Sequence, residues 1–255
     1  MSQFKILRQS GTNYSDLLVI SQVAMLENIQ TVNVKLGGVA EHERLLTSEA
    51  ELWVPVGSVE FVREAMLVAG IKEPENLSYP EPLMKYLGRS VRKGSLNQIS
   101  EPCFIKPQAT KLFTGFVYDP AKEVDQYSEH DIEQLMALTE PNAQKDLWIS
   151  EPVSWSAEYR FYILKGKIAG FGRYDDNEEE LIPPDIKVVN QMLDSWKDSG
   201  TLPAACSIDV GVLSDGWGTT LVECNDAWAL GYYKGSLKPV DYAQMLASRW
   251  MELRG

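Results

Sequence analysis

The chain has 255 residues, of which 44% are hydrophobic and 24% charged, and its formal net charge at pH 7 is -12. This length and composition are typical of a globular protein that buries a substantial core, as one large domain or two small ones. An acidic surface repels phosphate backbones and anionic bilayers, so we expect no nucleic-acid partner and no membrane partner. With only two histidines, a histidine-rich transition-metal site is disfavoured.

The cysteines and the first residues bear on the compartment. Cys103, Cys206 and Cys224 are scattered along the chain and form no CxxC pair. We expect reduced thiols, as in a cytoplasmic protein. The first ten residues lack the apolar core of a secretory signal, and no apolar run approaches the length of a membrane span. The sequence therefore predicts a cytoplasmic location.

Two domains are predicted, residues 1–98 and residues 99–255, because the sequence pattern changes at 95–102. The first domain is expected to be a small α/β unit, in which a helical periodicity ends at Gly70 and a loop rich in proline and glutamate follows. This prediction rests on the apolar runs 17–26 and 51–57 and on the expected helices 58–70 and 83–94.

The second domain is richer in strands, and its pattern predicts an α+β fold in which antiparallel sheets dominate. One expected helix begins after a serine N-cap, and another has proline at its start and glycine at its end. The expected strands are 103–107, 115–119, 147–153, 158–166, 167–175 and a hairpin over 208–226, and the expected helices are 128–139, 183–200 and 239–253.

The hairpin carries acidic residues in arms that otherwise look ready for burial. Its turn lies near Gly216, and this position sets a register that places Asp209 roughly opposite Glu223, with Asn225 on the same face. Two carboxylates so close repel each other unless a cation meets them. Two carboxylates and an amide oxygen are hard ligands suited to Mg2+. The alternative is a solvated polar face on an edge hairpin.

Two lysines lie in and after the strand 103–107. Lys106 ends this strand, and Lys111 lies in a loop that also contains Thr114 and Gly115. A lysine beside a flexible loop can reach phosphate oxygens as a point charge, although a single lysine is more often a surface residue with its stem packed on apolar atoms. The loop lacks the GxxxxGK[ST] pattern, which disfavours a P-loop fold.

A strand near the middle of the second domain alternates charged and apolar residues. Glu158 and Arg160 share one face of this strand. They are a cross-strand ion pair in the simpler interpretation. In the functional interpretation, Glu158 binds a ribose and Arg160 binds a phosphate or a transition-state oxyanion.

Taken in order, these segments resemble the ATP-grasp superfamily over about residues 100–255. The shared features are a strand lysine followed by a flexible loop, a glutamate where a strand meets a hinge, a second glutamate seven residues later, and an Asp–Glu–Asn set on a hairpin. The segment 55–61 and the N-terminal unit are also similar to a divergent ATP-grasp clade of bacteria and phages, once filed as a domain of unknown function. For a phage-encoded member, the compartment would be the host cytoplasm.

The resemblance implies two α+β subdomains that grip ATP between antiparallel sheets, preceded by a small pre-ATP-grasp domain. It also implies roles for individual residues. The implied ATP-binding residues are Lys106, Lys111, Thr114, Gly115, Ile149, Glu151, Pro152, Val153, Glu158 and Arg160. The implied Mg2+ ligands are Asp209, Glu223 and Asn225, and the implied catalytic residues are Arg160, Lys111 and Lys234.

The implied activity is an ATP- and Mg2+-dependent carboxylate–amine ligase that works through an acyl-phosphate. Its substrates would be small-molecule, peptide or protein carboxylates and amines. One position departs from the pattern, because Ser207 stands where many members have an arginine that faces the γ-phosphate. An ATP-binding regulatory module without ligase turnover and an ATP-grasp phosphotransferase are the alternatives.

Overall fold

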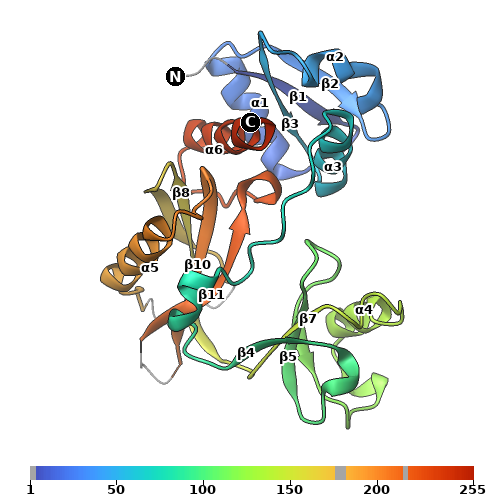
Figure 1. Ribbon diagram of the computed structural model, residues 1–255, viewed down its shortest axis with the longest axis vertical. Helices are drawn as coiled ribbons and strands as arrows, with labels where there is room; N and C mark the ends of the chain where they lie inside the picture. The colour runs from blue at the N-terminus through green and yellow to red at the C-terminus, as the bar shows by residue number, and fades with distance from the viewer. Residues whose placement is uncertain (1–3, 176–181, 215–217) are drawn as a thin grey trace.

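The computed structural model describes residues 4–175, 182–214 and 218–255, which form three sheets (Figure 1). The N-terminal sheet is parallel, with the strand order β2-β1-β3. Its neighbouring strands are joined by crossovers, as parallel pairing requires. Its elements are β1 (Phe4–Ser10), α1 (Ser15–Leu26), β2 (Thr31–Lys35), η1 (Val39–His42), α2 (Glu43–Leu46), β3 (Leu52–Val56) and α3 (Val59–Val68).

Local sequence explains the boundaries of α3. The Ser58 side chain accepts a hydrogen bond from the Phe61 amide at the start of this helix, which satisfies one of its free N–H groups. Just beyond its end, Gly70 has a φ of +70°, a left-handed conformation that glycine adopts without steric cost. The predicted helix over 58–70 is confirmed.

The second sheet belongs to a small lobe formed by residues 91–150. It is antiparallel, with the order β4-β7-β5-β6. Ile105, Leu147 and Ile149 lie on the face that packs in a small core with Phe116 and Leu138, just beyond α4. The elements of this lobe are β4 (Val91–Gly94), η3 (Leu96–Gln98), β5 (Cys103–Pro107), β6 (Phe116–Tyr118), η4 (Val124–Gln126), α4 (Glu129–Ala137) and β7 (Leu147–Ser150).

The third sheet is antiparallel, with the order β11-β10-β8-β9, and we call it the large sheet. Helix α5 covers one face, where Met192 and Trp196 pack in one core with Phe161 and Ile208. The elements are β8 (Trp155–Leu164), β9 (Lys167–Arg173), α5 (Ile186–Asp198), β10 (Ala205–Leu213), β11 (Thr219–Asp226), η5 (Ala227–Ala229) and α6 (Pro239–Arg254).

The last helix packs against the first domain. Helix α6 contacts α1, β3 and β10, and Met245 and Trp250 are buried in the same core as Ile6 and Leu7 of β1 (Figure 1). The C-terminal end of the chain therefore completes the hydrophobic core of the N-terminal unit. The predicted boundary between residues 98 and 99 stays a prediction.

The α+β fold class with dominant antiparallel sheets is confirmed, but the helix predicted over 83–94 is wrong. This segment forms a short 3-10 helix, η2 (Glu81–Tyr86), and then β4. The two are separated by Gly88, whose φ of +62° ends the helical conformation. Leu83 and Leu87, which suggested helical spacing, instead pack in the core under α5. The predicted turn at 215–217 lies outside the described residues.

None of the helices within the described part of the chain is both long enough and apolar enough to cross a bilayer.

Candidate functional site

The acidic hairpin has the predicted register. Asp209 on β10 lies opposite Glu223 on β11, and Ser207 lies opposite Asn225. Strand β10 is interior to the large sheet, and Asp209 and Ser207 are both fully buried. The alternative of a solvated polar face is therefore wrong for Asp209. A buried carboxylate is costly unless charged or hydrogen-bonding partners surround it.

Arg160 is the main partner of Asp209. The two residues face each other on β8 and β10, and the guanidinium donates from Nε to Oδ1 at 2.9 Å and from Nη2 to Oδ2 at 2.6 Å. Ser207 donates a further hydrogen bond to Oδ1 at 3.0 Å. Burial opposes the charge on Arg160, but the facing carboxylate of Asp209 raises the guanidinium pKa above its ordinary value. Arg160 therefore supplies a guanidinium beside the serine that occupies the position of the expected arginine.

Glu223 is paired with the strand lysine of the small lobe. The Lys106 ammonium lies 2.5 Å from Glu223 Oε2, and this ion pair joins β5 of the small lobe to β11 of the large sheet. Burial raises the Glu223 pKa, but the Lys106 charge and the hydrogen bonds from Lys106 and Asn225 outweigh it and hold the pKa below the ordinary value. The side-chain nitrogen of Asn225 donates to Asp209 Oδ2 and to Glu223 Oε1, each at 2.9 Å.

The donor set of this cluster fits Mg2+. Two carboxylates and one amide meet at one point of the hairpin, and a flip of the Asn225 amide would direct its oxygen to the same point. Within the described ranges, no group of three or more His, Cys, Asp or Glu side chains could hold a metal ion. In this arrangement Arg160 and Lys106 supply the positive charge that the two carboxylates need.

Two tyrosines complete the surroundings of Arg160. The guanidinium lies over the rings of Tyr174 and Tyr233, at 5.4 and 4.9 Å from their centroids, and these rings stack on each other. The Tyr174 hydroxyl donates to Glu158 Oε2 at 2.7 Å. Burial raises the pKa of Glu158 above its ordinary value, although the bond from Tyr174 opposes the shift.

A cavity of about 760 Å3 lies between the small lobe and the large sheet, and we call it the interlobe cavity. Asp209 lies buried beside it, bonded to two of its lining residues, Arg160 and Asn225. The structure thus brings together most of the predicted site. The predicted residues that line this cavity are Lys106, Lys111, Thr114, Gly115, Glu158, Arg160, Glu223 and Asn225.

The predicted adenine-binding segment lies elsewhere. The Ile149 side chain is buried in the core of the small lobe. Glu151 is exposed and accepts a hydrogen bond from the Ser90 amide at 3.0 Å. Ile149, Glu151 and Pro152 line a different hollow, whereas Val153 is half-buried and follows β7 directly. Their role in adenine binding stays a prediction, and it would have to use main-chain groups or a rearranged hinge.

Lys234 also lies outside the cluster. It is exposed in the segment between η5 and α6 and does not line the interlobe cavity. Its neighbour Asp226, another acidic residue of the hairpin, forms a buried ion pair with Arg249 of α6. A catalytic role for Lys234 stays a prediction.

Sequence reasoning missed the aromatic residues that support Lys106. Its ammonium lies 4.9 Å from the centroid of the Tyr79 ring, and Tyr79 meets Trp148 edge-to-face at 5.0 Å. Arg89 also lies over Tyr79 and donates hydrogen bonds to main-chain carbonyls of β11. Tyr79 lies in a proline-rich loop without hydrophobic periodicity, so no local pattern could have connected it to the site.

Comparison with known families and structures identifies the fold. Residues 86–245, more than half of the chain, match the model of an ATP-grasp domain family, the second family of its clade. The chain belongs to this ATP-grasp family. No curated protein sequence matches the chain.

Solved structures of other ATP-grasp proteins are similar to the whole chain. A RimK domain ATP-grasp protein from Sphaerobacter thermophilus is 12% identical, with a TM-score of 0.53 and 98% of each chain covered. D-alanine–D-alanine ligase from Bacillus anthracis is 15% identical, with a TM-score of 0.51 over 98% of this chain and 96% of the ligase. At such low identity these likenesses establish the ATP-grasp fold.

Proposed function

We propose that this ATP-grasp protein is an ATP- and Mg2+-dependent ligase that joins a carboxylate to an amine through an acyl-phosphate. One observation carries the proposal: the interlobe cavity gathers two carboxylates, an amide, an arginine and two lysines from separate segments of the chain. Such a set suits a polyphosphate with a hard cation. The likeness to a D-alanine–D-alanine ligase supports ligase chemistry.

In this proposal the small lobe binds the phosphates. Lys106 and Lys111 contact phosphate oxygens, and the main chain around Thr114 and Gly115 closes over them. A side chain at Gly115 would collide with the Phe104 ring, because its Cβ would lie 2.4 Å from a ring carbon. The main chain therefore packs closely on β5 at this point, which supports a phosphate-covering loop without a side chain in the way.

The large sheet provides the metal ligands and the arginine. Asp209, Glu223 and Asn225 would hold Mg2+, which when bound would neutralise and orient phosphate oxygens. Arg160 and Lys106 would then no longer be needed to neutralise the two carboxylates. We propose that these two cations turn to the phosphoryl group, so that Arg160 performs the task expected of an arginine at position 207.

The remaining assignments carry over from the resemblance. Glu158 would bind the ribose hydroxyls, and the main chain over 149–153 would meet the adenine edge. Lys234 would approach the reacting groups only if its segment moved toward the interlobe cavity.

In the proposed reaction, an oxygen of the substrate carboxylate attacks the γ-phosphorus, and the bond to the bridging oxygen breaks as ADP leaves. The amine nitrogen then attacks the acyl carbon, the bond from that carbon to the phosphate oxygen breaks, and the amine loses a proton. Water must be excluded, because the acyl-phosphate hydrolyses readily. The substrates are small-molecule, peptide or protein carboxylates and amines. We place this activity in the cytoplasm, since all three cysteines are free thiols.

The test is incubation of the protein with Mg-ATP and pools of amino acids and peptides. ADP and phosphate that form only with an acceptor, together with a new amide, support the ligase. Tight ATP binding without turnover would instead support a regulatory module, which Ser207 first suggested. A phosphorylated product that accumulates would support a phosphotransferase.

A further inference from the structure

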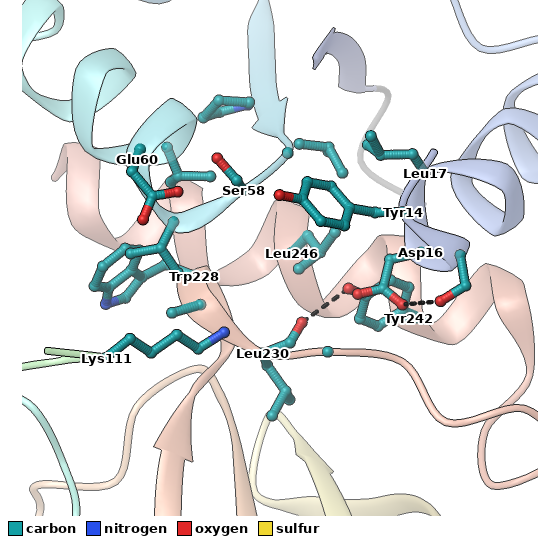
Figure 2. Close-up of a pocket in the computed structure, with 18 residues that line it drawn as sticks. Tyr14, Asp16, Leu17, Ser58, Glu60, Lys111, Trp228, Leu230, Tyr242 and Leu246 are labelled. Carbon is teal, nitrogen blue, oxygen red and sulfur yellow. Dashed lines mark hydrogen bonds between the residues drawn. The ribbon is translucent and has the colours of Figure 1, made fainter. Parts of the chain in front are cut away.

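A second cavity, of about 300 Å3, lies where the N-terminal sheet meets the end of the large sheet, and we call it the N-terminal cavity. The turns that leave β1 and β3 form one wall, and η5 and α6 form the other (Figure 2). Open α/β sheets bind their ligands at the carboxyl ends of the strands, which is where this cavity lies. Its size suits a small molecule better than a nucleotide.

The N-terminal cavity adjoins the interlobe cavity. Lys111 lines both, and so do the residues from Trp228 to Gly231. Figure 2 shows the Lys111 side chain extending below Trp228 toward Leu230, with Asp16 and Tyr242 on the far side. A ligand bound here would therefore have one end at the interlobe cavity.

One wall carries a carboxylate with a free oxygen. Asp16 Oδ1 accepts hydrogen bonds from the Tyr232 amide at 3.2 Å and from the Ser15 hydroxyl at 3.4 Å. Its Oδ2 accepts none from the described residues and lies 3.6 Å from where a Cβ on Gly231 would be. Burial raises the pKa of Asp16, although these bonds and the charges of Lys111 and Arg160 oppose the shift. A half-buried carboxylate with an unused oxygen is suited to receive an ammonium group.

The opposite side carries a cation without a partner. Lys111 forms no ion pair within the described ranges, and its φ of +52° is a left-handed conformation that is uncommon for lysine. Surrounding protein and the nearby charge of Arg160 lower the pKa of its ammonium. Glu60, the other acid of this cavity, is already used in capping α3, because its own amide and Ser58 hydrogen-bond to it.

We propose that the N-terminal cavity binds a small α-amino acid, with its ammonium group on Asp16 Oδ2 and its carboxylate on Lys111, facing the interlobe cavity. The side chain would lie against Tyr14, Trp228 and Leu246, which favours small or apolar amino acids. This inference rests on the proposed ligase function and names its carboxylate substrate. Lys111 then lies between the carboxylate and the site proposed for the phosphates.

The experiment measures equilibrium binding by calorimetry, without nucleotide, of pools of the twenty proteinogenic amino acids and then of single members. The N-acetyl derivative and the carboxamide of each amino acid that binds test the two ends of the ligand on the unmodified protein. Both derivatives should bind at least about tenfold more weakly, since each loses a charged hydrogen-bonding end.

Three variants locate the site. Asp16→Asn and Lys111→Met should each weaken amino-acid binding about tenfold or more. Gly231→Ala should also weaken it, because its methyl group would cover Asp16 Oδ2 at an ordinary contact distance of 3.6 Å. The matched controls Asp198→Asn and Lys187→Met change exposed residues on and beside the ends of α5 and should bind as the unmodified protein does.

The outcomes separate this inference from the ligase proposal. If no amino acid binds, or if binding survives all three variants, the inference is overturned even where the protein forms amides from other carboxylates. If an amino acid binds with the expected variant effects but Mg-ATP produces no ADP in its presence, the cavity is assigned correctly and the ligase proposal fails.

Discussion

Arg160 and Asp209 form a buried, two-pronged ion pair across neighbouring strands of the large sheet, with N···O distances of 2.9 and 2.6 Å. The carboxylate is fully buried, and the guanidinium keeps only a small exposed fraction at the interlobe cavity. Removing one member of such a pair leaves an uncompensated charge in a medium of low polarity, which costs more than the intact pair contributes. The pair is therefore structural without a ligand and becomes available to one when another cation neutralises Asp209.

Arg160→Met should lower the free energy of unfolding by about 3–5 kcal/mol, because Asp209 loses its charged partner. Urea denaturation at neutral pH measures this change. The double variant Arg160→Met, Asp209→Asn should recover part of the loss, since no charge is then left unpaired. Arg44→Met, at an exposed position of α2, is the control and should stay within about 0.5 kcal/mol. An Arg160→Met protein as stable as this control would contradict the prediction.

Glu223→Gln should weaken Mg-ATP binding by about tenfold or more while leaving metal-free ATP binding nearly unchanged, because only the metal depends on this carboxylate. Calorimetric titration with Mg2+ present and with a chelator present separates the two. Glu75→Gln, an exposed residue of the loop before η2, is the matched control. Equal loss with and without Mg2+ would mean that Glu223 acts through Lys106 rather than as a metal ligand.

The sequence predicted the hairpin register because a tight turn fixes which residues of its two arms face each other. Asp209 and Glu223 therefore lie opposite each other as expected. The partners of these acids come from β8 and from the small lobe. Their approach depends on the strand order β11-β10-β8 and on how the lobes pack, and neither is written in local periodicity.

The N-terminal cavity shows the same limit. Asp16 belongs to the first turn of α1, Lys111 to a loop of the small lobe and Gly231 to the segment before α6. Each residue alone has an ordinary explanation, as a helix-start acid, a surface lysine and a loop glycine. Only the return of α6 to the N-terminal sheet places them around one space. By contrast, the expected helix over 83–94 failed because Gly88 interrupts a spacing that was otherwise helical.

The stability of the protein should depend on pH through Asp16. Burial raises the folded-state pKa of Asp16 above its unfolded value of 3.8, so the folded state binds more protons than the unfolded state between these two values. The contribution of Asp16 to stability is therefore fully present below 3.8 and is lost as the pH rises through the raised pKa. The slope cannot exceed about 1.4 kcal/mol per pH unit for one group.

The measurement is the difference in unfolding free energy between the unmodified protein and Asp16→Asn, followed from about pH 4 to 7, where carboxylates titrate. Groups common to both proteins cancel in this difference. The unmodified protein should lose stability relative to the variant as the pH rises. A difference that stays constant or moves in the opposite direction would show that Asp16 is not destabilised as an anion.

Arg249→Met should destabilise the protein without weakening Mg-ATP binding. Arg249 donates to both oxygens of Asp226, at 2.8 and 2.6 Å, and so ties α6 to the end of β11. Breaking this buried pair should cost about 3–5 kcal/mol of unfolding free energy. Calorimetry at a temperature where the variant is folded should give an unchanged Mg-ATP affinity. A large loss of affinity would instead place Asp226 in the nucleotide site.

Finally, ATP should protect the protein against thermal unfolding more than GTP does. The proposed adenine contact is with main-chain groups over 149–153, and main-chain donors and acceptors distinguish the amino group of adenine from the carbonyl of guanine. A ligand stabilises the folded state in proportion to the logarithm of its concentration relative to its dissociation constant. At equal, saturating Mg2+ and equal nucleotide concentration, the midpoint shift should therefore be larger with ATP. Equal shifts would contradict an adenine-specific hinge and favour binding through the triphosphate alone.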